Sequence, residues 1–410
     1  MMKKLSIFCL SLGIAIASYE IAFAIPLKAV SEDRVRNIGL DWQLQPQFMR
    51  DGNSVYCREK KSNCPLETSP QAGWNESSRQ SLLTAVDRSL NYLNSPKAKR
   101  DYAKYRQSPF NLSHIRRSLL RFKVLLLATD SPQQLEKAVK KEFAFYQSSG
   151  QDNRGKVEFT GYFEPSYSAS AVPTAEYRYP LYRQPANFAR WSRPHPTRAQ
   201  LEGKDGLSAH KGRLAGYELV WLRDRLEAFL VQVQGSAKLQ LTDGTTMSVG
   251  YGGATNYQYS SIGKELVKDG IFTIEELSLP KLLAYFDANP QQLDEYIPRN
   301  NRFIFFKQTN GAPPIGSLGV PVTGDRSIAT DKSLMPPGAL ALIVAPIPDV
   351  NDRGEIETRV VSRYVLDQDT GSAIKGAGRV DIFMGSGKLA GEKAGRVNDR
   401  GSLFYLLLKE

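Results

Sequence analysis

The chain has 410 residues, enough for two or three domains, of which 41% are hydrophobic and 23% are charged. This balance is ordinary for a globular protein and excludes a fibrous or wholly disordered chain. The formal net charge of +12 suits contact with an anionic polymer or membrane surface, or serves solubility alone.

The first 24 residues have the three parts of a secretory signal peptide. A basic start, 1–4, precedes an apolar run, 5–17, and the sequence Ala22-Phe23-Ala24 is a small-x-small cleavage site. The run is too short to span a bilayer. Cys9 lies inside it without the surroundings of a lipoprotein signal. We expect an exported protein, periplasmic or bound to the cell wall, and leave association with the outer membrane open.

Two cysteines remain after the signal peptide, Cys57 and Cys64, in a polar stretch. In an oxidising compartment this pair predicts a disulfide. The chain contains only three histidines, His114, His195 and His210, which argues against a histidine-rich zinc site. We therefore expect no metal, no cofactor and no nucleic-acid partner.

Residues 25–150 are predicted to be an irregular leader followed by packed helices. Apolar residues recur at helical spacing over 82–93, 112–126 and 135–146. Ser131 followed by Pro132 predicts the start of the third helix. These stripes indicate a core and carry no recognisable chemistry.

Residues 155–310 change in character and favour strands. Val157–Phe163 and Ala228–Gln234 are predicted as strands, and Asp243-Gly244 as a hairpin turn. The sequence Thr273-Ile-Glu-Glu276 resembles a capping box that opens a short helix. A further helical patch is expected over 282–296.

Residues 316–400 predict a compact β-barrel, because short strands alternate with Gly- and Pro-containing turns. The predicted strands are Ala339–Val344, Thr358–Leu366, Gly378–Phe383 and Leu403–Leu408.

The sequence Asp369-Thr370-Gly371 has two interpretations. It is the short signature of aspartic proteases, in which two such loops share one proton, so a chain with a single loop would need to dimerise. Alternatively, Asp369 belongs with Asp331 and Asp381, which also lie beside predicted strand ends or turns. Each of the three alone could be a turn former.

Asp381 is the most informative of these aspartates, because Val380, Ile382 and Phe383 surround it in the sequence. Partial desolvation should raise the pKa of its carboxyl group, and nearby Asp331 and Asp369 should act in the same direction. A carboxyl that stays protonated near neutral pH is what a glycosidic general acid requires.

A series of short motifs runs across residues 155–410. The motifs are Phe159–Pro165, Tyr179–Tyr182, Val231–Ser236, Val249–Gly253, Ser317–Pro321, Arg326–Ala329, Pro337-Gly338 and Gly385–Gly387. Together they resemble the membrane-bound lytic murein transglycosylase A family. The C-terminal part resembles its 3D module, named for three aspartates, here Asp331, Asp369 and Asp381. One departure is Ala237, which stands where the family motif after Gln234-Gly235-Ser236 usually has glycine.

The resemblance implies a mainly β fold with N-terminal helices, in which a double-psi β-barrel carries a second, inserted β-domain. It also implies a peptidoglycan lytic exotransglycosylase, which cleaves between N-acetylmuramic acid and N-acetylglucosamine and leaves a 1,6-anhydro end. Asp381 would be the acid and base, supported by Asp369 and Asp331. The implied sugar contacts are Thr370, Gln234, Gly235, Ser236, Tyr162 and Tyr251.

Three alternatives stay open at this point. Tyr162, Tyr251 and Tyr259 could stack on sugar rings or pack the barrel. The chain could bind glycan strands without cleaving them. The aspartic protease is the third.

Overall fold

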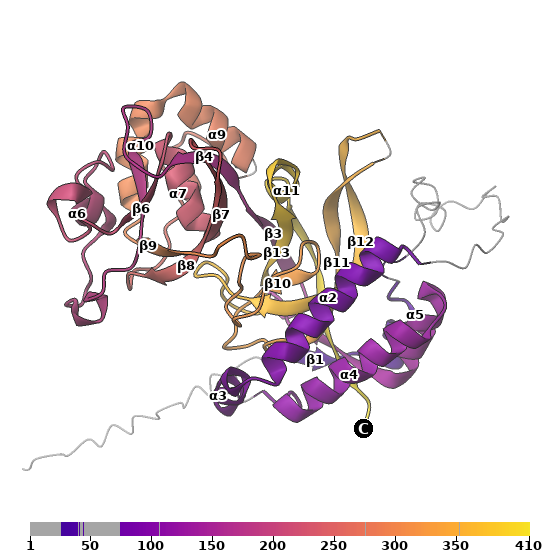
Figure 1. The fold of residues 1–410 in the computed structure, drawn as a ribbon. Helices are drawn as coiled ribbons and strands as arrows, with labels where there is room; N and C mark the ends of the chain where they lie inside the picture. Colours follow the sequence, from indigo (N-terminus) through magenta and orange to yellow (C-terminus); the bar gives the residue numbers. More distant parts are fainter. Residues whose placement is uncertain are drawn as a thin grey trace, which may run out of the picture.

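The computed structural model describes residues 26–39, 41, 44 and 74–410, apart from 106, 275 and 352. The predicted signal peptide and the Cys57–Cys64 pair lie outside these described residues. The chain forms two lobes, a barrel covered by helices and a second lobe at the upper left of Figure 1. Across the described ranges, every helix is too short or too polar to cross a membrane.

Four N-terminal helices are each started by a side-chain cap. Asn75, Ser95, Asn111 and Ser131 each accept a hydrogen bond from a backbone N–H of the first turn, which satisfies one of its free donors. The predicted helices are thus confirmed. The helices are α2 (Glu76–Leu93), α3 (Pro96–Lys104), α4 (Leu112–Ala128) and α5 (Pro132–Glu142), after a short α1 (Glu32–Arg36).

The third predicted helical stripe is wrong beyond residue 142. Helix α5 ends at Glu142, and Phe143–Ser148 forms strand β2, which pairs with β14 and with β1 (Leu27–Ala29). Phe143 and Phe145 are buried at alternate positions. The spacing of these apolar residues fits a helix as well as a strand. They form a strand here because pairing with β14 decides the conformation.

Six strands close into a barrel in the order β14-β11-β12-β10-β13-β3, with β3 pairing back onto β14. Two neighbouring pairs are parallel, β10 with β12 and β13 with β3. The predicted barrel and its four strands are confirmed. The strands are β3 (Val157–Glu164), β10 (Ser327–Ala329), β11 (Leu340–Val350), β12 (Ile356–Asp369), β13 (Arg379–Ser386) and β14 (Asn398–Leu408), with helix α11 (Lys388–Ala394) between the last two.

The second lobe is inserted between barrel strands β3 and β10 and contains a six-stranded sheet in the order β5-β6-β4-β7-β8-β9. The inserted β-domain is therefore confirmed, although helices contribute more of it than expected. Its strands are β4 (Ser166–Ser170), β5 (Tyr179–Tyr182), β6 (Glu218–Leu222), β7 (Ser236–Leu241), β8 (Thr246–Ala254) and β9 (Ile304–Gln308). Its helices are α6 (Arg198–Glu202), α7 (Arg225–Gln234), α8 (Ile262–Lys268), α9 (Leu279–Ala288) and α10 (Leu293–Tyr296), with 3-10 turns at Phe188–Arg190, Ala209–Lys211, Pro290–Gln292 and Ile297–Arg299.

Two local predictions in this lobe are wrong. Ala228–Gln234 is helical, because Asp224 caps the N-terminus of α7 and Gly235, with φ of 81°, ends it. A short apolar run does not distinguish a buried helix from a buried strand. Thr273 and Glu276 do exchange the hydrogen bonds of a capping box, but they lie in a turn, and α9 begins at Leu279. The predicted Asp243-Gly244 hairpin turn joins β7 to β8, as expected.

A buried glutamine joins the helices to the barrel. The amide nitrogen of Gln368, on β12, donates to the Ala85 carbonyl oxygen (2.8 Å) and the Ser89 hydroxyl (2.9 Å) of α2. Its amide oxygen accepts from the Ser327 hydroxyl of β10 at 2.5 Å. Gln368 is fully buried, so these groups have little access to water.

Replacing Gln368 by alanine should destabilise the barrel lobe by about 3 kcal/mol, because it leaves buried partners without a hydrogen bond. Thermal unfolding followed by tryptophan fluorescence measures this loss. The exposed Gln240→Ala is the control, since its hydrogen bonds lie at the surface. An unchanged midpoint in Gln368→Ala would show that the helices dock without this contact.

Candidate active site

Asp369 and Asp381, two of the three predicted aspartates, lie on the two strands that flank β10. Ala329, on β10, pairs with Asp369 of β12 and with Asp381 of β13. Residues directly opposite each other in a sheet point to the same face. The two aspartate backbones are therefore two strand spacings apart, about 10 Å, with only a small alanine side chain between them.

Asp381 has a partner on its other side as well. Thr160, on β3, is opposite Asp381 in the register, and its hydroxyl donates to Asp381 Oδ1 at 2.8 Å. Arg379 Nη2 donates to the same Thr160 hydroxyl oxygen at 3.3 Å, and Arg379 Nη1 pairs with Glu158. A row of side chains thus fixes the rotamer of Asp381 from behind.

Burial raises the pKa of Asp381 to about 6, and the charge of Asp369 adds to this, although the Thr160 hydrogen bond and Arg379 act to lower it. The predicted effects of desolvation and of Asp369 on this pKa are confirmed. The residue is partly exposed, so it can be approached from the barrel face.

Asp369 has its oxygens occupied by protein donors. The Tyr162 hydroxyl donates to Oδ2 at 2.9 Å, while the backbone N–H groups of Ser317 and Thr370 donate to Oδ1 at 2.7 and 2.8 Å. Tyr162 lies two residues after Thr160 on β3, so both side chains point to the same face. Burial and the charge of Asp369 keep the pKa of Tyr162 well above its usual value, and its hydroxyl remains a donor.

Asp331 is held in a turn. Its Oδ1 accepts from the backbone N–H (3.1 Å) and hydroxyl (2.6 Å) of Ser333, and its Oδ2 accepts from the N–H of Gly376 (2.9 Å). Burial acts to raise the pKa of Asp331, but these hydrogen bonds and Lys375 hold it below its usual value. Asp331 therefore ties two turns of the chain together through these hydrogen bonds.

The remaining predicted contacts differ in what they can offer a ligand. The Thr370 hydroxyl donates to the Thr330 carbonyl oxygen at 2.7 Å. Gln234 accepts from the backbone N–H of Phe163 at 3.1 Å, which joins α7 of the inserted lobe to β3. Gly235 is the left-handed cap of α7 and Ser236 is buried at the start of β7. Tyr251, on β8, is 50% exposed and is the aromatic ring most free to stack.

Sequence reasoning gave no role to Thr160 or Arg379, although Thr160 stands in a motif with Tyr162. Thr160 and Tyr162 are two positions apart on a predicted strand, so their side chains point to one face. This spacing was the signal that could have placed Thr160 beside the predicted contact Tyr162. The contact of Thr160 with Asp381 spans 221 residues and follows only from the strand order.

The two lobes are connected next to this face. Glu164, at the end of β3, is buried and accepts a hydrogen bond from the Ser386 hydroxyl at 2.6 Å. Its burial raises the pKa of its carboxyl group. The backbone N–H of Lys238 donates to the Pro165 carbonyl oxygen at 2.9 Å. These contacts join β3 and β13 of the barrel to β7 of the inserted sheet.

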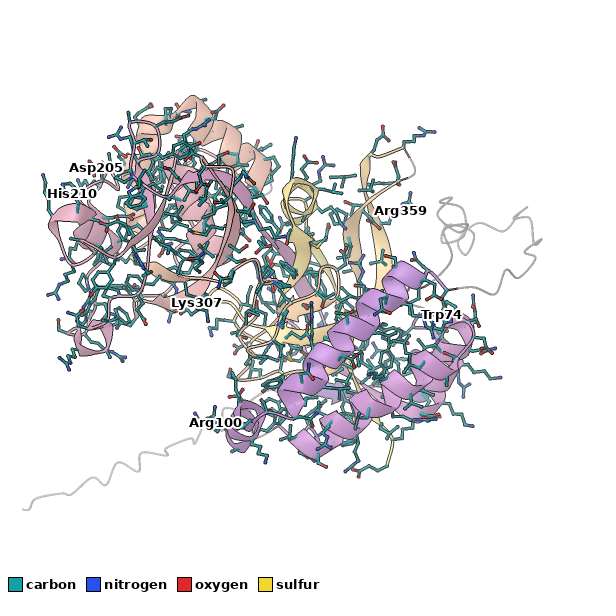
Figure 2. The ribbon with its side chains drawn as sticks, in the orientation of Figure 1. Trp74, Arg100, Asp205, His210, Lys307 and Arg359 are labelled. Carbon is teal, nitrogen blue, oxygen red and sulfur yellow. The ribbon has the colours of Figure 1, made fainter. Side chains whose placement is uncertain are left out.

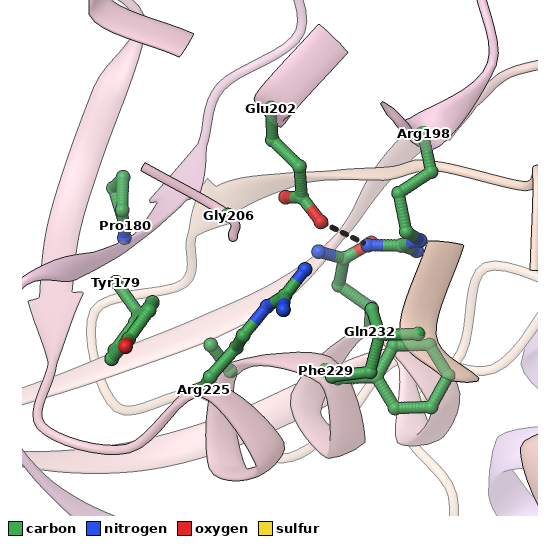
Figure 3. A pocket seen from close by; sticks show the side chains of 10 residues that line it. Tyr179, Pro180, Arg198, Glu202, Gly206, Arg225, Phe229 and Gln232 are labelled. Carbon is green, nitrogen blue, oxygen red and sulfur yellow. Dashed lines mark hydrogen bonds and ion pairs between the residues drawn. The ribbon is translucent and has the colours of Figure 1, made fainter. Parts of the chain in front are cut away.

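A cavity of about 10 Å³ in the inserted lobe is a separate feature. Figure 3 shows Arg198, Arg225, Glu202 and Gln232 around it, with Arg198 donating to Glu202 at 3.0 Å. Its volume suits one water molecule, which could satisfy the buried Nε of Arg225. It is too small for a sugar. Within the part of the chain that the structure describes, no cluster of three potential metal ligands occurs.

The raised pKa of Asp381 has a consequence for stability. Between the usual value of 3.8 and about 6, the folded protein binds more protons than the unfolded chain, so its stability falls as the pH rises. Asp381→Asn removes this penalty. It should stabilise the protein by up to about 3 kcal/mol above pH 6, and leave stability unchanged below pH 4. Thermal unfolding of both proteins across this pH range measures the difference, and a constant difference would contradict the assignment.

Comparisons with known proteins agree with this geometry. The model of the MltA specific insert domain matches residues 158–307, and that of the 3D domain matches residues 326–407. Membrane-bound lytic murein transglycosylase A of Escherichia coli strain K12 is 33% identical over 264 residues, which are 64% of this chain and 68% of the relative. The Vibrio cholerae protein is 32% identical over 267 residues, 64% of this chain and 68% of that relative.

Solved structures give the same result. E. coli MltA with bound chitohexaose matches with a TM-score of 0.62 at 27% identity, covering 80% of this chain and 90% of that one. The lytic transglycosylase LtgG of Burkholderia pseudomallei matches with a TM-score of 0.51 at 32% identity, covering 84% and 95%. With an insert domain and a 3D domain in the order and strand arrangement described, this chain belongs to the family of membrane-bound lytic murein transglycosylase A.

Proposed function

We propose that this chain is a lytic transglycosylase of peptidoglycan. It cleaves the β-1,4 bond between N-acetylmuramic acid and N-acetylglucosamine and forms 1,6-anhydromuramic acid. The observation that carries the proposal is the carboxyl of Asp381, whose pKa burial raises to about 6 while Thr160 holds it in a fixed position on the barrel face. Membership of the family supports the reaction class, and the chitohexaose bound to E. coli MltA supports a glycan strand as the ligand.

In this reaction one carboxyl acts twice. Protonated Asp381 gives its proton to the glycosidic oxygen as the bond from C1 of muramic acid breaks. The resulting carboxylate then accepts the proton of the C6 hydroxyl as O6 bonds to C1. The proton passes from O6 to the leaving oxygen through Asp381, and water takes no part. The nucleophile is tethered to the substrate, so positioning replaces a second catalytic group.

The surroundings of Asp369 argue against ordinary hydrolysis. A glycosidase that hydrolyses the bond needs a second carboxylate to activate water or to attack C1. Both oxygens of Asp369 already accept hydrogen bonds from Tyr162, Ser317 and Thr370. In our proposal Asp369 raises the pKa of Asp381 through its charge, and Asp331 holds the neighbouring loops in place.

Tyr251, Thr370, Gly235 and Ser236 are the proposed sugar contacts. Tyr251 offers an exposed ring for stacking. Gln234 and Tyr162 contribute through their contacts to β3 and to Asp369. Cutting from strand ends, the exo mode, is included in the proposal, as is an exported protein that acts in the cell envelope.

Asp381→Asn should abolish the release of anhydromuropeptides, a loss of at least a thousandfold, because asparagine cannot give and regain the proton. The measurement is mass spectrometry of products from purified peptidoglycan. The exo mode predicts single disaccharide-peptides from the earliest time points, whereas internal cuts would first give longer fragments.

The variant should still bind peptidoglycan, since the amide keeps the shape of the side chain. Asp349→Asn, at the far end of β11, is the matched control and should keep full activity. Full activity of Asp381→Asn would refute the proposal. Bound glycan without product from the wild type would favour a non-catalytic binding protein, and cut peptides a protease.

Tyr162→Phe tests the role of Asp369. Without the hydroxyl, the side chain of Asp369 loses a donor that fixes its position beside Asp381, so its charge should act less strongly on Asp381 and the pKa of Asp381 should fall. The descending limb of kcat/KM should then move to lower pH by about half a unit at most, which lowers activity at neutral pH by about threefold. Tyr251→Phe is the control and should leave the profile in place. A uniform loss of activity at every pH would indicate a structural role for the Tyr162 hydroxyl.

A further inference from the structure

The outward face of α4 has a feature that catalysis does not use. Leu120, Val124 and Leu127 are 42%, 49% and 53% exposed and follow one another at helical spacing. They form a stripe of three large apolar side chains along one side of the helix. Scattered single apolar residues are common at surfaces, but a contiguous line of them indicates a contact surface.

Helix α4 presents this stripe rigidly. Its opposite face is buried and includes Ile115, Leu119 and Phe122. The Ser118 hydroxyl oxygen accepts from the N–H of Leu408 at 2.9 Å, and the ring Nε2 of His114 lies 2.8 Å from the Leu408 carbonyl oxygen. Trp74, labelled in Figure 2, donates from its indole N–H to the Thr129 carbonyl oxygen just after the helix, at 3.2 Å. Because both ends are fixed to the barrel lobe, the helix cannot rotate to bury the stripe.

The surroundings of the stripe are basic. Helix α4 itself carries Arg116, Arg117, Arg121 and Lys123 and no acidic residue. Residues 74–142 contain fourteen Lys and Arg against six Asp and Glu, a net charge of +8, whereas the whole chain has +12. Most of the excess charge of the protein is therefore concentrated in its helical region.

The acidic groups near the stripe are largely neutralised by partners. Asp87 pairs with Lys123 at 2.6 Å, Glu142 with Arg121 at 2.6 Å, and Glu136 with Lys140. Glu410 lies 3.6 Å from Arg117. Lys137 and Lys141 are exposed on α5, which packs beside α4 in Figure 1. Basic side chains therefore outnumber acidic ones around the stripe.

We propose that the outward face of α4 docks this protein onto an anionic phospholipid surface. Leu120, Val124 and Leu127 enter the boundary between headgroups and acyl chains, while Arg116, Arg117 and the α5 lysines contact the phosphates. This is the arrangement of an interfacial amphipathic helix, in which apolar insertion and attraction to anionic lipid add together. Long basic side chains reach the headgroups while their stems cover apolar surface.

The apolar stripe and the basic side chains around it together favour a lipid over other occupants. An anionic glycan would use the cations but would leave the apolar stripe in water. A second copy of this chain would place two strongly positive helical regions against each other, which is unfavourable. An anionic bilayer satisfies both the charge and the stripe.

The experiment measures binding of the purified protein to phosphatidylcholine vesicles, with and without phosphatidylglycerol, by co-flotation. The wild type should bind the anionic vesicles, and added salt should weaken binding. A triple variant, Leu120→Ser with Val124→Ser and Leu127→Ser, should bind at least tenfold more weakly. Arg116→Gln with Arg117→Gln should lower binding to anionic vesicles and reduce its dependence on salt.

The inserted lobe provides matched controls. Val172→Ser removes an apolar side chain that is 61% exposed, and Lys204→Gln with Lys211→Gln removes two exposed charges. Both should leave vesicle binding unchanged. Release of product from soluble glycan fragments should be the same in all these variants, because none lies at the candidate active site. The thermal midpoint confirms that each variant is folded.

Four results would overturn the proposal. The wild type could fail to bind anionic vesicles, or the triple variant could bind them as the wild type does. Light scattering could instead reveal a dimer of the wild type that the triple variant dissociates, which would assign the stripe to a second copy. Loss of binding to peptidoglycan in the triple variant, with vesicle binding intact, would assign it to the wall.

Discussion

Asp381 is held by the register of three strands, and the rest of the candidate site depends on this constraint. Strand β13 lies between β10 and β3, which places Ala329 on one side of Asp381 and Thr160 on the other. The same register of β10 on β12 brings Asp369 to the same face. A shift of one residue would turn the carboxyl to the opposite face of the barrel wall. Main-chain pairing of these strands thus sets the positions of Asp381 and Asp369.

The three aspartates share a motif but have three electrostatic environments. Asp381 is desolvated with one hydrogen-bond donor, Asp369 has three donors, and Asp331 is fixed in a turn with its pKa lowered. Asp381 combines a raised pKa, about 6, with partial exposure of the residue. A reaction whose nucleophile is part of the substrate needs only one carboxyl that gives and accepts a proton. The different environments of the three aspartates therefore fit the proposed transglycosylase chemistry.

Sequence patterns predicted the barrel strands and the capped helices because local signals decide them: apolar alternation for β12 and β13, and Ser131 with Pro132 for α5. They failed where an apolar run fits either conformation, as in α7, where the Asp224 cap and Gly235 determine a helix. They also could not supply contacts between distant segments. Thr160 with Asp381 and Tyr162 with Asp369 join residues more than 200 positions apart, and only the closure of the barrel brings them together.

In the proposed mechanism Asp381 carries a proton from O6 to the leaving oxygen, and water does not attack C1. The most direct test is digestion of peptidoglycan in water labelled with heavy oxygen, followed by mass spectrometry of the muramic acid ends. The account predicts anhydro ends that carry no label. Reducing ends with one labelled oxygen would show that water attacks C1 and would contradict it.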